Sequence, residues 1–171
     1  MFPVKGFQLQ FGTGDIAGLA ERYSYSDDSS ARRAGAEARK LGHYTLDGFL
    51  TVCRWKTRRS EPKVVANSAE QVKAATSQAL SATDEGVKMD ALLSLEGVGV
   101  PTGSALLHFA DPESYPILDV RALESLGRKG RGTYPVSFWV DYLTACRSLS
   151  SKCGVSIREL DKALWQWSAE Q

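Results

Sequence analysis

Apolar residues recur every three or four positions along most of this chain, which is the spacing of one buried face of an α-helix. Strict alternation of apolar and polar residues, the pattern of a half-buried strand, is scarce. Helical segments are predicted over 15–23, 30–41, 45–55, 68–80, 83–95, 101–109 and 119–127, then one marked by Phe138, Tyr142 and Leu149, and one after Ser156. We therefore expect an all-α, compact multi-helix domain without internal repeats.

Several helix ends carry their own local signals. Ser68 with Gln71 has the spacing of a capping box, and Gly42 is a C-terminal stop. In helix 83–95, the spacing puts Val87 on the buried face. The segments predicted to be flexible are 24–29, 58–63 and 128–133.

The composition is that of one ordinary globular domain. The chain has 171 residues, a hydrophobic fraction of 43% and a formal net charge of +1. This charge argues against a strongly basic coating protein but permits a local basic face. No apolar run is long enough to span a bilayer, and the N-terminus lacks the layout of a signal peptide. We expect a cytoplasmic protein without a membrane partner, associated with the nucleoid if it is bacterial.

The cysteines give no sign of a metal centre. Cys53, Cys146 and Cys153 are odd in number and contain no closely spaced pair of metal ligands. Free thiols in a reducing compartment are therefore favoured over disulfides or zinc. An iron–sulfur cluster is not expected either, because four cysteines would be needed to hold it.

The most distinctive segment is Leu-Glu-Gly-Val-Gly at 95–99. Gly97 and Gly99 can adopt backbone angles closed to other residues and leave no side chain between the backbone and a phosphate. The helix that follows adds unpaired N–H groups, and the hydroxyls of Thr102 and Ser104 are further donors. For Gly-Val-Gly alone, an ordinary turn between two helices is the better interpretation.

Asp119 follows about one helix later and makes a functional interpretation of this segment more favourable than an ordinary turn. Pro116 disfavours helix at Tyr115, so the chain is expected to be extended before it becomes helical near Asp119. An isolated Asp there is best explained as an N-cap. Its apolar approach through Ile117 and Leu118 also predicts partial burial, where a carboxylate can stabilise a developing cation or activate water. The two roles are compatible.

Together these features resemble the helix-hairpin-helix DNA glycosylase superfamily. That family has a Leu-x-Gly-Val-Gly hairpin, a helix, and an apolar stretch that ends in a catalytic Asp, here Asp119. The resemblance covers 95–127 strongly and the rest of the chain only through its helical character. It implies a single two-lobed domain over 1–171, with lobes formed by 1–65 with 134–171 and by 66–133.

The resemblance also implies where DNA would bind. A monovalent cation would join the hairpin carbonyls to the duplex, and no other cofactor would be required. The residues implied in DNA binding around the hairpin and after the Asp are Gly97, Val98, Gly99, Thr102, Gly103, Ser104 and Arg121.

One departure from the family pattern concerns the chemistry. Members that also cut the strand carry a nucleophilic Lys on the first turn after the hairpin, where this chain has Pro101. The resemblance therefore implies a monofunctional enzyme without strand-cleaving activity, in which Asp119 stabilises an oxocarbenium-like sugar and assists a water molecule. Lys56 or Lys88 could reach the pocket from elsewhere as a substitute, although nothing in the spacing shows it.

Two basic clusters and two aromatic residues complete the candidate site. Trp55 can stack on a base and Tyr115 can line the base pocket, because glycosylases enclose an extruded base between such groups. For both, packing inside the protein is about as good an interpretation. The cations proposed to contact phosphates, with solvated surface charges as the alternative, are Lys56, Arg58, Arg128, Lys129 and Arg131.

These observations favour a monofunctional DNA N-glycosylase that excises a damaged or modified base, in repair or in defence against modified phage DNA. Its partner would be double-stranded DNA with a flipped base. The alternatives are a noncatalytic DNA-binding or adaptor module on a glycosylase-like scaffold and, less favoured, a helical protein-interaction domain.

Overall fold

The protein is all-α over residues 3–171, the part of the chain that the computed structural model describes. An isolated bridge between Val4 and Phe7 is the only strand-like pairing in this range. The elements are the 3-10 turn η1 (Thr13–Asp15), α1 (Ile16–Glu21), α2 (Ser29–Leu41), α3 (Leu46–Lys56), α4 (Glu61–Val64), α5 (Ala69–Ser81), α6 (Glu85–Leu93), α7 (Val100–Ala110), α8 (Val120–Ser125), α9 (Val136–Cys153) and α10 (Ile157–Ala169).

The predicted helix ends are largely confirmed. Ser68 and Gln71 form a complete capping box, and Gly42 ends α2 with a left-handed φ of 80°. Two details of the prediction are wrong. Val87 is 41% exposed and does not face the core, and the segment 58–63 contains the start of α4.

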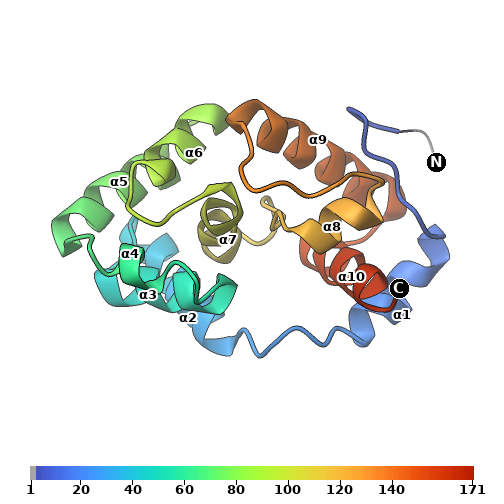
Figure 1. The fold of residues 1–171 in the computed structure, drawn as a ribbon, viewed down its shortest axis with the longest axis horizontal. Coiled ribbons are helices and arrows are strands. Elements are labelled where there is room, and N and C mark those ends of the chain that lie inside the picture. The colour runs from blue at the N-terminus through green and yellow to red at the C-terminus, as the bar shows by residue number, and fades with distance from the viewer. Residues whose placement is uncertain (1–2) are drawn as a thin grey trace.

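The helices pack in two groups, on either side of the centre of Figure 1. In one group, α2 and α3 pack on α7, and α5 packs on α6. In the other, α1 and α8 pack on α10. This packing differs from the expected lobes, because α2 and α3 were assigned to the same lobe as 134–171, yet they lie against α7. The reason is direct backbone contact: a Cβ at Gly35 of α2 would lie 2.0 Å from the Phe109 carbonyl oxygen.

Helix α7 is the central element of the fold (Figure 1). All its residues except Pro101 are buried. A Cβ at Gly103 would lie 2.6 Å from the Met89 sulfur, so this glycine allows α6 to approach closely. The hairpin 95–99 precedes α7, and Phe109 near its other end packs against Trp55. Helix α7 therefore connects the hairpin 95–99 to the aromatic contact between Phe109 and Trp55.

Candidate functional site: an aromatic pocket at Asp119

The extended segment that leads into Asp119 is held by side chains from two distant helices. The Asp161 carboxylate of α10 accepts the Ile117 N–H, with N···O distances of 3.0 and 3.1 Å to its two oxygens. The Tyr142 hydroxyl of α9 donates to the Ile117 carbonyl oxygen at 2.7 Å. Because both backbone groups of Ile117 are satisfied by buried partners, the path to Asp119 is fixed.

The same segment is also tied to α7. Ser104 Oγ accepts the Leu118 N–H at 2.9 Å and donates to the Pro101 carbonyl oxygen at 2.7 Å. Ser104 is fully buried and uses its hydroxyl in this bridge. It was expected to contact DNA. Its observed role is internal, since no surface of this side chain reaches solvent.

His108 supplies a third tie. Its Nδ1 lies 2.7 Å from the Tyr115 carbonyl oxygen, which only an N–H donor can satisfy. Burial lowers the pKa of His108 to about 3, and the positive charge of Arg158 acts in the same direction. The ring is therefore neutral and carries its proton on Nδ1. The 3.8 Å approach of His108 to Asp161 is not an ion pair.

Asp119 is the N-cap of α8. Its Oδ1 accepts the Ala122 N–H at 2.8 Å, which confirms the capping role expected from the sequence. Burial raises the pKa of Asp119 above its usual value, while the positive charge of Lys56 and the N–H groups of Ala122 and Arg121 oppose that shift. The carboxylate thus combines a desolvated position with donors that favour its ionised form.

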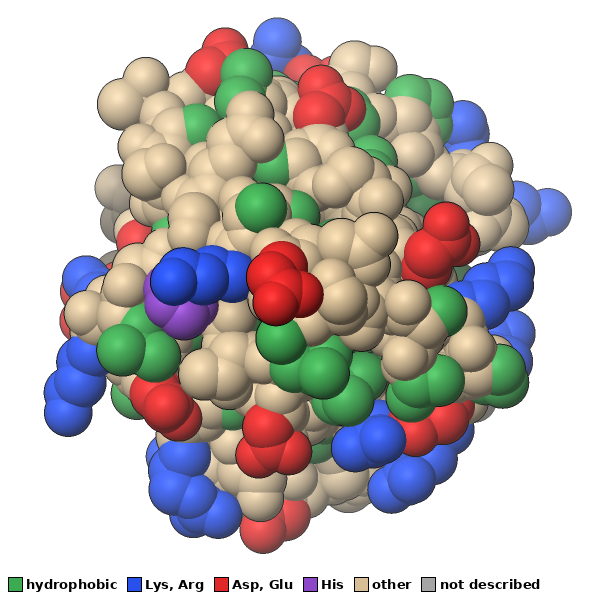
Figure 2. Space-filling model, turned by 90° about the vertical axis from the view of Figure 1, so that its left-hand side faces the viewer, with side chains coloured by type: hydrophobic (Ala, Val, Ile, Leu, Met, Phe, Trp, Pro, Cys, Tyr) green, Lys and Arg blue, Asp and Glu red, His purple; other side chains and the backbone are tan. Residues whose placement is uncertain are grey.

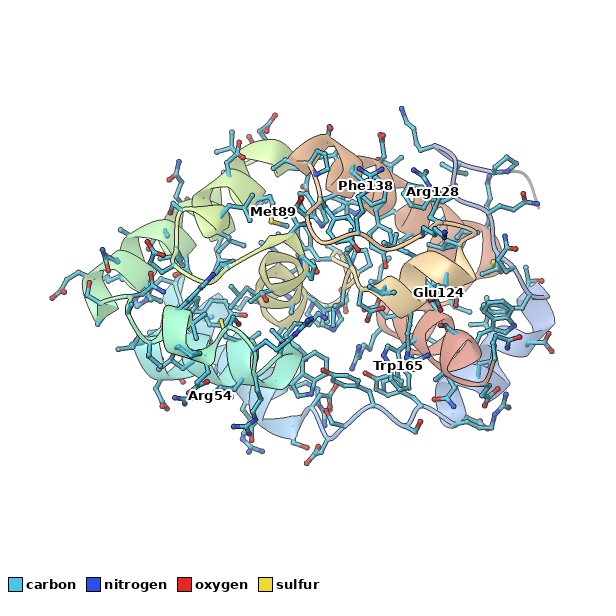
Figure 3. The ribbon with its side chains drawn as sticks, viewed as in Figure 1. Arg54, Met89, Glu124, Arg128, Phe138 and Trp165 are labelled. Carbon is cyan, nitrogen blue, oxygen red and sulfur yellow. The ribbon has the colours of Figure 1, made fainter. Side chains whose placement is uncertain are left out.

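Asp119 lies in a narrow pocket between the two groups of helices, with a cavity volume of about 20 Å³. Trp165 reaches this central region from α10 in Figure 3. The lining residues come from the α1–α2 connection, the end of α3, the segment before α8, and α10. They are Tyr23, Tyr25, Trp55, Lys56, Ile117, Asp119, Arg158, Asp161 and Trp165.

Four aromatic rings form much of the wall. Tyr25 meets Trp55 and Trp165 edge-on, with ring centroids 5.0 and 5.4 Å apart, and Tyr23 meets Trp165 at 5.5 Å. The Tyr25 hydroxyl donates to the carbonyl oxygens of Trp55 and Lys56 at 3.0 Å each. The α1–α2 connection is thereby fastened over the end of α3. The pocket is walled by π-surfaces of the kind on which bases stack.

Trp55 carries an unused hydrogen-bond donor. Its Nε1 is buried and has no partner among the described residues. A buried donor without an acceptor is uncommon in native proteins and calls for an explanation. An acceptor on a bound ligand would provide one.

Asp161 is a second carboxylate in the pocket, and the sequence analysis missed it. Burial raises its pKa to about 8, and the negative charge of Asp119 adds to the shift, against Arg158, the Ile117 N–H and Lys56. A signal was present in the sequence. Asp161 falls on the apolar face of α10 defined by Leu160 and Leu164, where a charge needs a partner.

Arg158 is that partner on the same helix. Its guanidinium lies 3.7 Å from Asp161, donates to Asp28 at 2.8 Å, and lies over the Tyr23 ring at 5.2 Å. Arg158 therefore connects α10 to the α1–α2 connection beneath the pocket. Asp28 balances its charge inside the protein, and Asp161 contributes to that balance when it is ionised.

The two lysines considered from the sequence occupy different places. Lys56, at the end of α3, lines the pocket with Asp119. Lys88 donates to the Ala79 carbonyl oxygen at 2.9 Å and lines a second cavity of about 310 Å³.

Tyr115 also lines the second cavity and is not among the residues around Asp119. Its hydroxyl donates to Glu85 at 3.0 Å, and its ring stacks on Trp139 with centroids 6.4 Å apart. The expected base-pocket position of Tyr115 is therefore wrong for this conformation, because its ring turns away from Asp119 toward α6 and α9.

The hairpin packs against α4. Gly97 has a φ of +78°, and a Cβ there would lie 2.8–2.9 Å from atoms of Lys63 and Val64. Asn67 fixes the turn further: its Nδ2 donates to the Glu96 carbonyl oxygen and its Oδ1 accepts the Glu96 N–H, both at 2.9 Å. Gly97 is therefore required by both its backbone angle and the space available.

Only part of the hairpin region is available to a ligand. Gly99 is exposed and Gly97 is half-buried, and neither backbone N–H has an acceptor among residues 3–171. The other implied DNA contacts face inward: Val98 and Thr102 are only 8% and 4% exposed, and Gly103 packs on α6. A phosphate would meet backbone N–H groups here and not the Thr102 hydroxyl.

The expected phosphate-binding cations are spread over two regions. Arg58 is exposed between α3 and α4, beside the pocket residue Lys56 in the chain. Arg121 is exposed and lies over the Trp165 ring at 5.3 Å, at the edge of the pocket. The remaining cluster lies apart: Arg128 sits beside Phe138 of α9 in Figure 3, and its guanidinium is 5.2 Å from that ring.

Lys129 and Arg131 are exposed, and Arg131 also lies over the Phe138 ring, at 5.4 Å. None of the three cations at 128, 129 and 131 is among the pocket-lining residues. Basic and acidic side chains are interspersed on the face seen in Figure 2, so that face has no continuous positive surface.

Residues 3–171 contain no cluster of three or more His, Cys, Asp or Glu side chains that could hold a metal ion. At the hairpin, the carbonyls of Leu95, Glu96 and Gly99 accept hydrogen bonds within the protein. A monovalent cation there would rely on the carbonyls of Gly97 and Val98. No helix within the described range is long and apolar enough to cross a membrane.

Comparison with family models, curated proteins and solved structures finds no match to this chain. The function must therefore be argued from the pocket itself.

Proposed function

We propose that this protein is a DNA N-glycosylase that excises a damaged or modified base. The observation that carries the proposal is the position of Asp119. It caps α8 inside an aromatic pocket, and one central helix, α7, connects that region to a glycine turn with free backbone N–H groups. Aromatic walls suit an extruded base, and the turn suits a phosphate.

The surface between the Asp119 pocket and the glycine turn carries positively charged residues. The chain leaves the pocket at Lys56 and passes exposed Arg58 and Arg59. It reaches Lys63, whose Cβ lies against the position of Gly97. A DNA backbone that follows these cations would bring one nucleotide to the pocket while the turn holds a phosphate nearby. The contacts would fix position without reading sequence.

In the pocket, the base would stack on the tryptophan and tyrosine rings, and an acceptor atom on the base would satisfy the unpaired Trp55 indole N–H. The ionised form of Asp119, which Lys56 and the α8 N-terminus favour against burial, would stabilise positive charge on the sugar as the bond to the base breaks. Pro101 offers no amine, so water would complete the substitution at the sugar. The first product would be a free base and an abasic strand.

The test is mass-spectrometric detection of bases released from diverse genomic and phage DNAs. Asp119→Asn keeps an N-cap acceptor but removes the charge, and we expect it to lower release by about 100-fold or more. Asp84→Asn is the matched control, because Asp84 caps α6 in the same way, with its Oδ1 2.9 Å from the Val87 N. Its release should equal that of the wild type.

If Asp119→Asn releases bases as fast as the wild type, the mechanism is wrong. If the folded wild type binds DNA and releases no base from any sample, a noncatalytic DNA-binding module replaces the proposal. The chemical identity of a released base would separate repair of damage from defence against modified phage DNA.

A further inference from the structure

In this conformation, the Asp119 pocket is too small for the base that the proposed function places in it. Its cavity volume is about 20 Å³, which is room for about one water molecule. A nucleic-acid base is a planar ring system comparable in size to an aromatic side chain. One of the groups that line the pocket must therefore move before a base can enter.

The ring of Tyr25 occupies the space that a base would need. Its centroid lies 5.0 Å from that of Trp55 and 5.4 Å from that of Trp165, and it meets both rings edge-on. These separations are those of direct aromatic contacts. A side chain of the protein thus lies against both tryptophans on which an extruded base would stack.

Tyr25 belongs to the α1–α2 connection, residues 22–28, which contains neither helix nor strand. In Figure 1 the connection runs along the lower edge of the molecule, from α1 in one group of helices to α2 in the other. Apart from its two tyrosines it consists of serine, aspartate and arginine, and none of its side chains is fully buried. Such a segment opens at low cost, because few contacts with the core are broken.

A few polar contacts hold the connection closed. The Tyr25 hydroxyl donates to the carbonyl oxygens of Trp55 and Lys56, and the N–H and hydroxyl of Ser24 donate to Gln166 Oε1 at 3.0 and 3.1 Å. The two carbonyls belong to the last turn of α3, where water can satisfy them if the tyrosine leaves. Opening therefore leaves no buried group without a partner at this helix end.

Other parts of the lining are held more firmly. Both backbone groups of Ile117 have buried partners, and the Trp55 ring packs on Phe109 of α7 at a centroid distance of 4.9 Å. Tyr25 is therefore the aromatic group of the pocket that can be displaced with least loss.

We propose that Tyr25 is the gate of the Asp119 pocket. In the free protein its ring holds the place of the base, and the α1–α2 connection swings outward to admit one. The inference rests on the proposed function for the identity of the ligand, a base of DNA. The opening itself is a property of the protein alone and is tested without DNA.

The test measures the entry of an aromatic reagent into the pocket. Ile117→Cys places a thiol in the lining at a buried position. Dithiodipyridine, a thiol reagent with two aromatic rings, is larger than the closed cavity and should label this thiol only when the pocket opens. Adding Tyr25→Phe keeps the ring but removes the hydroxyl. We expect labelling to become about 2- to 10-fold faster, the effect of one lost hydrogen bond.

Two controls separate opening of the gate from other changes. Cys146 is fully buried outside the pocket, so its labelling in the same sample, resolved by peptide mapping, reports unfolding of the whole protein. Position 117 should be labelled at least about tenfold faster than Cys146. Tyr134→Phe in the Ile117→Cys protein is the matched control. It also removes a tyrosine hydroxyl, one that accepts the Arg131 N–H at 3.0 Å away from the pocket, and should leave labelling unchanged.

A second measurement needs no cysteine and applies even if Ile117→Cys fails to fold. The Ser24 N–H, which Gln166 holds, should exchange with solvent about 2- to 10-fold faster in Tyr25→Phe than in the wild type. Equal exchange in these two proteins overturns the inference.

The labelling experiment has equally definite outcomes. Equal labelling with and without Tyr25→Phe, or equal labelling of position 117 and Cys146, overturns the inference. Faster labelling in Tyr25→Phe, together with no base released from any DNA, would support the gate and count against the proposed glycosylase. Base release with unchanged labelling would do the reverse.

Discussion

The Ile117 N–H donates to the Asp161 carboxylate, with N···O distances of 3.0 and 3.1 Å, two residues before Asp119. Through this hydrogen bond Asp161 helps to position the backbone of Asp119, and the two carboxyl groups also interact electrostatically. Asp161 holds the backbone that presents Asp119, and the charge of Asp119 helps to keep Asp161 protonated. The protonation state of Asp161 should therefore affect the free energy of unfolding of the protein.

Asp161 should make the protein less stable as the pH rises from about 4 to about 8. An unfolded Asp ionises near pH ~3.9, whereas burial keeps Asp161 protonated to about pH 8 in the folded protein. Between these values the unfolded state binds fewer protons. The free energy of unfolding therefore falls by up to about 1.4 kcal/mol per pH unit from this group. Urea denaturation of the wild type and Asp161→Asn across this range measures the effect.

Asp161→Asn retains an oxygen that can accept the Ile117 N–H but cannot ionise. Its free energy of unfolding, relative to the wild type, should therefore increase with pH. Asp161→Ala removes the acceptor as well and should cost about 1–3 kcal/mol at pH 5, because it leaves the Ile117 N–H buried and unpaired. A constant difference between wild type and Asp161→Asn from pH 4 to pH 8 would contradict the assigned protonation.

The sequence predicted the helices well because their signals are local. Spacing of apolar residues, caps such as Ser68 with Gln71, and stops such as Gly42 act within one or two turns of chain. α4 was missed because four residues, Glu61–Val64, are too few to show a period. The grouping of helices was also missed, since it depends on contacts such as that of Gly35 with Phe109, which no local pattern encodes.

The residues of the candidate site also fall into those that local sequence predicts and those that only the fold brings together. Asp119 as an N-cap followed from the chain on either side of it, and Trp55 lines the same pocket as Asp119. Tyr23, Asp161 and Trp165 come from segments distant in sequence, so only the fold brings them together. Ser104 shows the opposite case, because a hydroxyl beside the hairpin proved to be directed inward to Leu118.

Gly97→Ala should damage the hairpin more than an ordinary glycine substitution. Gly97 and Gly42 have nearly the same φ, +78° and +80°, but only Gly97 has backbone and side-chain atoms within 3 Å of a built Cβ. Gly42→Ala should cost about 1 kcal/mol for the left-handed backbone alone. Gly97→Ala should cost about 1–3 kcal/mol more through its clash with Val64. Thermal unfolding of both variants measures the difference, and equal losses would remove the packing argument.

Glu96→Gln should strengthen binding to duplex DNA. Glu96 is exposed next to the free N–H groups of the turn, and its backbone is held by Asn67, so the substitution leaves the turn intact. Removing one repelling carboxylate should raise affinity about 2- to 5-fold at low salt and less at high salt. Fluorescence anisotropy at several salt concentrations tests this. Glu21→Gln is the control, because Glu21 is exposed at the end of α1. An equal gain in both variants would point to net charge and not to the hairpin.

Trp55→Phe separates stacking from hydrogen bonding in the pocket. Phenylalanine keeps an aromatic ring against Tyr25 and Phe109 but lacks the indole N–H, which has no partner in the free protein. No hydrogen bond is lost, so any loss of stability should come only from the packing of the larger ring. If the N–H binds an acceptor on the flipped base, base release should fall about tenfold.

Trp139→Phe is the matched control for this substitution. Trp139 also has a buried indole N–H without a partner, but it packs against Tyr115 and is not among the residues that line the Asp119 pocket. Release should be unaffected in Trp139→Phe, even if its stability changes as the larger ring is lost. Equal base release by the two variants would mean that the Trp55 N–H does not contact the base, and that Trp55 acts by stacking alone.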